Sequence, residues 1–160
     1  MKKAVGILLI CIIALNIALN GATALAEETV TVTVDGVKVD FDQPPIIVEG
    51  RTLVPIRAVA ERIEADVRWN PNTRTTTILH KNVGVALQIG YQYMTVRNLS
   101  TGDERVVTLD VPPQIYNNRT LLPIRIIMEM FGCNVEWDYI SKTVIITTED
   151  YASKTIVIGE

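Results

Sequence analysis

Hydrophobic and polar residues alternate in short runs along most of this chain, with the two-residue period of strands that have one buried and one exposed face. Residues 29–34 alternate threonine with valine, and Asp35-Gly36 then favours a tight turn into residues 37–41, so a hairpin is predicted here. Proline and glycine turns separate further runs, which predict hairpins and meander strands at residues 46–48, 67–69, 75–79, 85–89, 91–96 and 105–109.

Two segments have a helical spacing instead. Their apolar side chains follow the i, i+3, i+4, i+7 pattern of one buried helix face, at Ile56, Val59, Ala60 and Ile63 and again at Ile124, Ile127, Met128 and Phe131. Pro55 and Pro123 suit the first helical turn, where a missing N–H loses no hydrogen bond. The predicted fold is α+β, with an antiparallel sheet of hairpins and meander strands wrapped on two short helices.

The sequence around the two helices is duplicated with an offset of 68 residues. Residues 51–61 return as residues 119–129, and Pro44-Pro45 returns as Pro112-Pro113. This offset predicts two repeats, at about residues 30–80 and 98–148, that each contain a strand, a helix and a hairpin. The shared positions, interpreted as a structural motif, are Arg51, Pro55, Arg57, Glu61 and Trp69 in the first repeat and Arg119, Pro123, Arg125, Glu129 and Trp137 in the second.

The charged and aromatic positions of this motif have structural interpretations. Within each helix the arginine precedes the glutamate by four residues, so the pair can meet on the helix surface for roughly 0.2–0.5 kcal/mol, or tie the helix to a neighbouring strand. Trp69 and Trp137 are expected to be core residues that pack against the helix of their own repeat.

The first 26 residues have the form of a secretory signal peptide. Met1-Lys2-Lys3 precedes an apolar run at residues 4–19, and Ala24-Leu25-Ala26 forms an A-x-A cleavage site. The alternative is an uncleaved anchor, but polar residues and a glycine interrupt the run and leave it short of the roughly 20 apolar residues that a span needs. We therefore expect a signal peptide at 1–26, a folded domain at 27–150, and a C-terminal strand or tail at 151–160. The protein is expected to be secreted or held at the cell surface, with no membrane segment after cleavage.

The net charge argues against one class of partner, and the cysteine count excludes an internal disulfide. Cleavage removes two lysines and no acidic residue. The mature chain would then have 13 basic and 18 acidic residues, which is a net charge of −5. This balance argues against a nucleic-acid partner, because phosphate binding needs clustered positive charge. Only Cys133 remains after cleavage, so no internal disulfide is possible, and we expect a small buried hydrophobe at this position.

The combined motif carries a family resemblance. Residues 109–113, 118–125 and 135–138 resemble the copper amine oxidase N-terminal domain-like family, also called stalk-domain proteins, and residues 41–45 and 67–70 are similar to the same pattern. The resemblance covers roughly residues 30–148. Asn118 stands where the family usually has glycine before Arg-Thr, and asparagine tolerates the positive φ that such a turn requires.

The resemblance implies a small α+β domain of secreted and surface proteins of bacteria. In the oxidases this domain is a stalk, separate from the catalytic domain, whose copper is held by three histidines beside a tyrosine converted to a quinone. This chain has one histidine, His80, so that copper site cannot be built. The resemblance therefore implies the domain without the chemistry, and no cofactor.

Other routes to catalysis or metal binding have weak support in the sequence. His80 at a strand end is typical of a solvated or capping side chain. Asp40 with Asp42, and Asp103 with Glu104, could be paired carboxylates, but acids near turns more often solvate or cap. Asp42, Asp110 and Asp138 could supply oxygens to calcium, yet no ligand loop of regular spacing supports this. We assign no catalytic residue and no metal site.

Aromatic residues are the best candidates for a binding face, and they are Tyr91, Tyr93, Tyr116 and Tyr139. Two functional classes follow. The first is a non-catalytic module of the cell envelope that binds wall polysaccharide, a surface protein or copies of itself. The second is an unrecognised hydrolase or metal-dependent enzyme. Within the first class, self-association requires an unprotected edge strand, such as residues 29–34 or 155–158.

Overall fold

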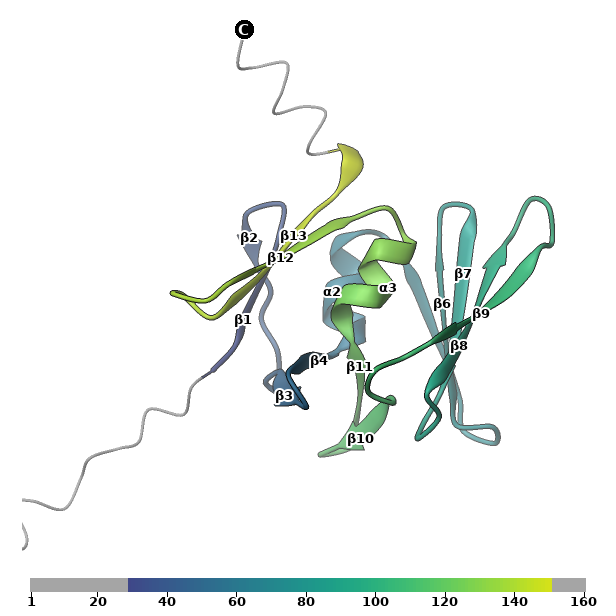
Figure 1. The fold of residues 1–160 in the computed structure, drawn as a ribbon, viewed down its shortest axis with the longest axis horizontal. Helices are drawn as coiled ribbons and strands as arrows, with labels where there is room; N and C mark the ends of the chain where they lie inside the picture. Colours follow the sequence, from purple (N-terminus) through teal and green to yellow (C-terminus); the bar gives the residue numbers. More distant parts are fainter. Residues whose placement is uncertain (1–28, 151–160) are drawn as a thin grey trace, which may run out of the picture.

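A computed structural model describes residues 29–150 of the chain. The predicted signal peptide and the predicted strand at 155–158 lie outside the described residues. Three sheets surround two short helices, and Figure 1 shows the helices above a central sheet, between a terminal sheet on one side and a meander sheet on the other. The fold is α+β and mostly antiparallel, as predicted.

The central sheet has the order β10-β11-β4-β3, formed by β3 (Ile46–Val48), β4 (Arg51–Pro55), β10 (Gln114–Tyr116) and β11 (Arg119–Pro123). Its middle strands pair antiparallel, with Val54 opposite Leu122 and Pro55 opposite Leu121. Residues 54 and 122 are 68 positions apart, so they are counterparts in the two predicted repeats. Exchanging every residue of this pair of strands for its counterpart therefore gives the same set of paired residues. The pairing therefore has a local two-fold axis between Val54 and Leu122.

The turns of the central sheet use positive φ angles. Glu49 and Gly50 have φ angles of 49° and 73° between β3 and β4, and Asn117 and Asn118 have φ angles of 44° and 61° between β10 and β11. Asparagine adopts this region more readily than most residues, so Asn118 serves the turn as predicted.

The helices α2 (Ile56–Arg62) and α3 (Ile124–Met130) directly follow the two central strands. Pro55 and Pro123 keep extended ψ angles of 98° and 107° as the residues before each helix, so their predicted place inside the first turn is wrong by one residue. Both helices end in the same way, with backbone bonds from Ala65 to Ala60 and from Cys133 to Met128. The predicted apolar faces are buried in both helices.

The terminal sheet has the order β12-β13-β1-β2. Its strands are β1 (Thr31–Val34), β2 (Val37–Lys38), β12 (Asn134–Asp138) and β13 (Thr143–Thr147). Two expectations fail here. The pair β1 and β13 is parallel, so the sheets are not antiparallel throughout, and β1 lies between two neighbours, so residues 31–34 are not an unprotected edge. Such pairing joins the two ends of the described chain, which period-two alternation cannot reveal.

The meander sheet contains β5 (Asp66–Asn70), β6 (Thr75–His80), β7 (Val83–Gln88), β8 (Tyr93–Asn98) and β9 (Glu104–Thr108), each antiparallel to the next. The predicted meander is confirmed. Apolar side chains from the helices, the flanking sheets and the central strands form one main core around Val54, Ile78, Leu122 and Ile127. Within residues 29–150 no helix is long and apolar enough to cross a bilayer.

Candidate functional site

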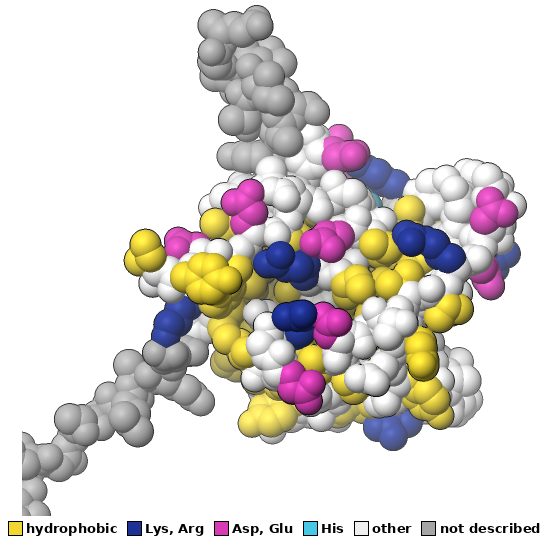
Figure 2. All heavy atoms as spheres, viewed as in Figure 1, with side chains coloured by type: hydrophobic (Ala, Val, Ile, Leu, Met, Phe, Trp, Pro, Cys, Tyr) yellow, Lys and Arg dark blue, Asp and Glu magenta, His cyan; other side chains and the backbone are white. Residues whose placement is uncertain are grey.

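Two grooves lie beside the helices. Groove 1 has a volume of about 620 Å³ between α3, the β12–β13 hairpin and the β3–β4 turn. Groove 2 has a volume of about 670 Å³ between α2, the β5–β6 hairpin and the β10–β11 turn. On the face drawn in Figure 2, basic and acidic side chains meet near the centre, beside hydrophobic side chains that gather over the β12–β13 hairpin.

Corresponding positions of the sequence line the two grooves. Each side chain of one set lies 68 positions from its counterpart; groove 1 contains Arg51, Asp110, Pro123, Arg125, Glu129 and Trp137, and groove 2 contains Arg119, Asp42, Pro55, Arg57, Glu61 and Trp69. All ten residues of the predicted structural motif are therefore groove residues. The grooves share no lining residue and lie on opposite sides of the local two-fold axis.

An arginine and an aspartate from distant parts of the chain close one end of each groove. Arg51 Nε donates to Asp110 Oδ2 at 2.6 Å, and Arg119 Nε donates to Asp42 Oδ2 at 2.7 Å. The hydrogen bond from Arg119 lowers the pKa of Asp42 below its ordinary value, so this carboxylate stays ionised. Each bond crosses between the two predicted repeats.

From the sequence, Asp42 is expected to solvate or cap a turn rather than act as a paired carboxylate, and Asp42 and Asp110 are weakly supported as calcium ligands. The structure places both in ion pairs with arginine instead. Their shared 68-residue offset, matched by that of Arg51 and Arg119, is the signal in the sequence that could have indicated two reciprocal pairs.

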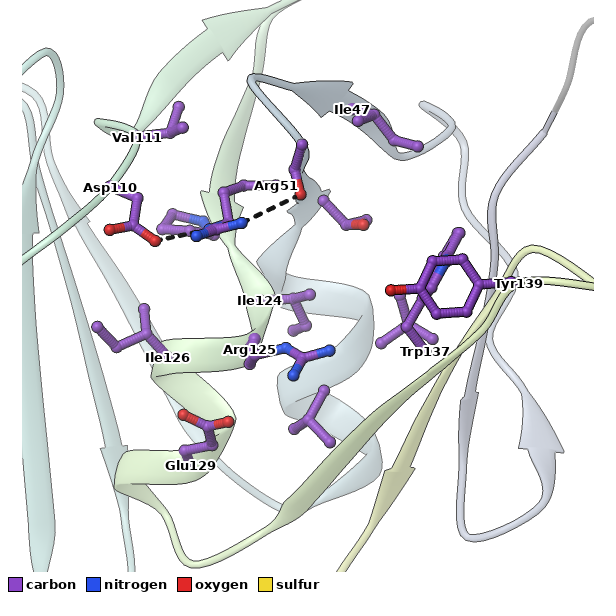
Figure 3. A pocket seen from close by; sticks show the side chains of 15 residues that line it. Ile47, Arg51, Asp110, Val111, Ile124, Arg125, Ile126, Glu129, Trp137 and Tyr139 are labelled. Atoms are coloured by element: carbon purple, nitrogen blue, oxygen red, sulfur yellow. Dashed lines mark hydrogen bonds and ion pairs between the residues drawn. The ribbon is translucent and has the colours of Figure 1, made fainter.

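The helices contribute one arginine and one glutamate to each groove. Figure 3 shows Arg125 and Glu129 on α3, with Trp137 and Tyr139 on the opposite side and the Arg51–Asp110 pair at one end. Arg57 and Glu61 occupy the matching positions in groove 2. All four helix side chains are exposed, and in the described part of the chain neither arginine forms an ion pair with the glutamate four residues on. These groups are free to meet a ligand.

The tryptophans line the grooves rather than filling the core. Trp69 is 38% exposed and Trp137 is half-buried, so the prediction of two core residues is wrong for Trp69 and holds only in part for Trp137, which also packs on the main core. Tyr139 stands edge-on to Trp137, with ring centroids 6.2 Å apart. Trp69 has no such aromatic neighbour among residues 29–150, because Pro71 occupies the position that corresponds to Tyr139.

A hydrogen-bonded turn holds Tyr139 in place. The carboxylate of Asp138 accepts bonds from the Ile140 backbone N–H at 2.8 Å and from the Ser141 hydroxyl at 2.7 Å. The Ser141 bond, followed by the backbone bonds, lowers the pKa of Asp138, so the turn stays anchored at neutral pH. Tyr139 itself is 83% exposed. Asp138 thus positions an aromatic side chain, a role different from the calcium ligand that the sequence analysis considered.

The four candidate tyrosines are all exposed, but they come from separate elements. Tyr91 precedes β8 and Tyr93 begins it, Tyr116 lies in β10, and Tyr139 lies in the β12–β13 turn. Of the four, only Tyr139 lines either groove. Within residues 29–150 no ring contact joins any two of them.

Thr76, the cross-strand neighbour of Trp69, is a buried polar residue. The two residues lie opposite one another in the β5–β6 pair, as Trp137 lies opposite Val144 in the β12–β13 pair. Thr76 is 2% exposed, lines groove 2, and its hydroxyl has no hydrogen-bond partner within the described residues. A buried hydroxyl without a partner is costly, so a polar ligand group that reached it would relieve that cost.

The other chemically interesting residues lie apart from the grooves. His80 is half-buried and stands edge-on to Phe131, with ring centroids 5.5 Å apart. Cys133 is buried, as predicted, and burial raises the pKa of its thiol. Asp103 accepts a hydrogen bond from Thr101 at 2.6 Å. Across residues 29–150 no three histidine, cysteine or acidic side chains gather as metal ligands would.

Each groove thus offers an aromatic ring, two guanidinium groups and at least two carboxylates. Rings provide flat apolar surfaces, whereas guanidinium and carboxylate groups donate and accept hydrogen bonds in fixed directions. This combination can bind a ligand that has both apolar faces and many hydroxyl or amide groups.

The model of the copper amine oxidase N-terminal domain family matches residues 33–148. That family of N-terminal domains is non-catalytic. No curated protein matches the sequence. The match covers both grooves and, apart from the first two residues of β1, all three sheets.

Proposed function

We propose that this chain, which belongs to the copper amine oxidase N-terminal domain family, is a non-catalytic module that binds polysaccharide of the bacterial cell wall. The predicted signal peptide would bring the domain to the envelope, as a secreted or surface-held protein. Groove 1 would be its binding site. The proposal excludes an enzymatic role for this domain, and the ion-paired state of Asp42 and Asp110 supports that exclusion, because each carboxylate is already bonded to an arginine.

The observation that carries the proposal is the aromatic pair Trp137 and Tyr139 facing Arg125 and Glu129 across groove 1. A sugar ring presents an apolar face of C–H groups and a rim of hydroxyls. The aromatic rings would contact that face, while the guanidinium and carboxylate would bond to the rim. Two arginines and two carboxylates line the groove, so its charge is balanced and favours an uncharged sugar over a polyanion.

We also propose that the domain arose from two repeats of one unit. Three observations support this: the two-fold register of β4 with β11, the reciprocal ion pairs, and the corresponding lining of the grooves. Each groove would be formed by the helix and the hairpin of one repeat together with one arginine from the other repeat.

Co-sedimentation of residues 27–160 with purified peptidoglycan sacculi tests the proposed function. We expect retention at low and moderate salt, competition by soluble glycan fragments released from the same sacculi with muramidase, and strongly reduced retention in Trp137→Ala/Tyr139→Ala. Tyr91→Ala/Tyr93→Ala is the matched control, because it removes two exposed rings outside both grooves, and it should be retained. Thermal melts confirm that both variants fold.

Two results would count against the proposal. If the unaltered protein stays in the supernatant, wall binding is wrong, and the search moves to surface proteins and self-association. If retention is lost in the Tyr91 and Tyr93 variant instead, wall binding stands but groove 1 is not the site.

A further inference from the structure

We infer that groove 2 is a second saccharide site, so that one molecule holds two segments of wall glycan at once. The class of ligand rests on the function proposed for groove 1. The existence and character of the second site rest on observations of groove 2 itself.

Groove 2 repeats the recognition groups of groove 1 on the other side of the axis. Trp69 supplies an exposed ring, and Arg57 and Glu61 on α2 supply a guanidinium and a carboxylate that form no ion pair within residues 29–150. Arg119 bonded to Asp42 closes one end. A further bond, from Asn117 Nδ2 to Gln43 Oε1 at 2.8 Å, joins the β10–β11 turn to the segment that carries Asp42. The site is therefore built and held in place before any ligand arrives.

Thr76 is an independent sign that a polar ligand enters groove 2. Thr76 lines the groove, and its buried hydroxyl is the one buried side-chain oxygen or nitrogen of residues 29–150 that has no partner. A sugar hydroxyl can both donate to and accept from this group. Groove 1 has Val144 at the same position, so this bond would be specific to groove 2.

The charge of groove 2 narrows its ligand further. Asp40, Asp42 and Glu61 face Arg57 and Arg119, which leaves one excess negative charge. This balance favours uncharged or amine-bearing sugars and disfavours polyanionic chains. Groove 2 also lacks a counterpart of Tyr139, so we expect it to bind more weakly than groove 1.

The arrangement of the grooves makes simultaneous binding possible. They share no lining residue, and the two-fold relation places them on opposite sides of the central strands. A glycan in one groove therefore does not occupy the other. A molecule with two such sites can bridge two glycan chains, which a single-site module cannot do.

A capture assay tests bridging. Residues 27–160 are first bound to peptidoglycan sacculi and washed, and fluorescently labelled soluble glycan from the same muramidase digest is then added. We expect the unaltered protein to capture labelled glycan. Trp69→Ala should stay on the sacculi but capture at least tenfold less, and Trp69→Ala/Trp137→Ala/Tyr139→Ala should not be retained.

Thr76→Val provides a second variant that preserves the ring and the fold. Loss of one hydrogen bond should weaken capture by roughly 2- to 10-fold while retention on sacculi is unchanged. Thr77→Val is the matched control, because Thr77 follows Thr76 in β6 and lines neither groove, and it should leave both retention and capture unaltered.

The outcomes separate the two proposals. If the unaltered protein is retained on sacculi but captures no labelled glycan, or if Trp69→Ala captures as much as the unaltered protein, the second site is refuted and the wall-binding function stands. If the unaltered protein is not retained at all, the proposed function fails, and the bridging inference fails with it.

Discussion

Arg51 and Arg119 each bond to an aspartate through one edge of the guanidinium, and in the proposed grooves the remaining N–H groups would be left for the ligand. In both cases Nε bonds to an aspartate from the other half of the chain. The pair fixes the direction of the side chain, and within residues 29–150 the remaining N–H groups of Arg51 reach only Gly50 O, at 3.5 Å. An arginine held in this way loses little conformational freedom when it binds a ligand. A lysine at either position could not keep this geometry.

His80 makes stability depend on pH. Burial lowers its pKa below the ordinary value of 6.5, and the charge of Lys81 lowers it further. The unfolded chain therefore binds a proton more readily than the folded chain, so the free energy of unfolding decreases as the pH falls below about 6.5. We expect His80→Gln to flatten this slope between pH 7 and 5. Urea titrations across that range measure it, and an unchanged slope would show that another group is responsible.

Asp42 and Asp138 make stability depend on pH only in a more acidic range than His80 does. The pKa values of Asp42 and Asp138 are lowered from 3.8, so their stabilising effect is complete above that value and is lost only as the pH falls further. The His80 effect can therefore be measured separately.

At the scale of elements, the helices and hairpins follow from local sequence. Each depends on neighbours along the chain: the helical spacing of apolar residues, Asp35-Gly36 in a turn with φ angles of 51° and 76°, and Asn118 at positive φ. The roles of the tryptophans were not predictable in the same way, because alternation shows that a residue shares a face with its neighbours but not whether a groove opens over that face. The sequence therefore identifies the groove residues as a repeated motif, but it does not show that they line grooves.

Strand β6 contains a substitution that should stabilise the free protein. Thr76 and Val144 hold corresponding places beneath the two tryptophans, but only Thr76 buries an unpaired hydroxyl. Thr76→Val removes that group at nearly constant volume, and we expect the free energy of unfolding to rise by roughly 1–3 kcal/mol. Val144→Thr should lower it by a similar amount. Urea denaturation of both variants measures the change, and a loss of stability in Thr76→Val would mean that the hydroxyl has a partner in solution.

At the scale of the whole molecule, strand pairs and ion pairs join the two halves of the chain. Strand β4 pairs with β11, β1 pairs with β13, and both arginine–aspartate bonds cross between the halves. The sequence predicts two repeats but not this exchange, because hydrophobic patterning specifies buried faces and leaves the identity and direction of distant partners open. This is why the parallel pair and the internal position of β1 differ from expectation.

Separated halves test this interdependence. We cut the chain in the β8–β9 turn, to give residues 27–102 and 103–160, and expect neither fragment to unfold cooperatively alone, because each lacks the central partner strand of the other. An equimolar mixture should regain a cooperative transition. Circular dichroism melts of each fragment and of the mixture decide the matter. Cooperative melting of either fragment alone would show that one half suffices.

The parallel pairing of β1 with β13 also determines how the domain responds to force. Thr31 lies opposite Thr143 at the start of both strands, so the chain enters this sheet at one end and leaves it at the other (Figure 1). Tension between the two ends of the described chain would load the hydrogen bonds of this pair in shear, so that many must break together rather than one after another. Pulling single molecules between residues 29 and 150, compared with pulling across the β12–β13 hairpin, should show the higher rupture force for the first geometry.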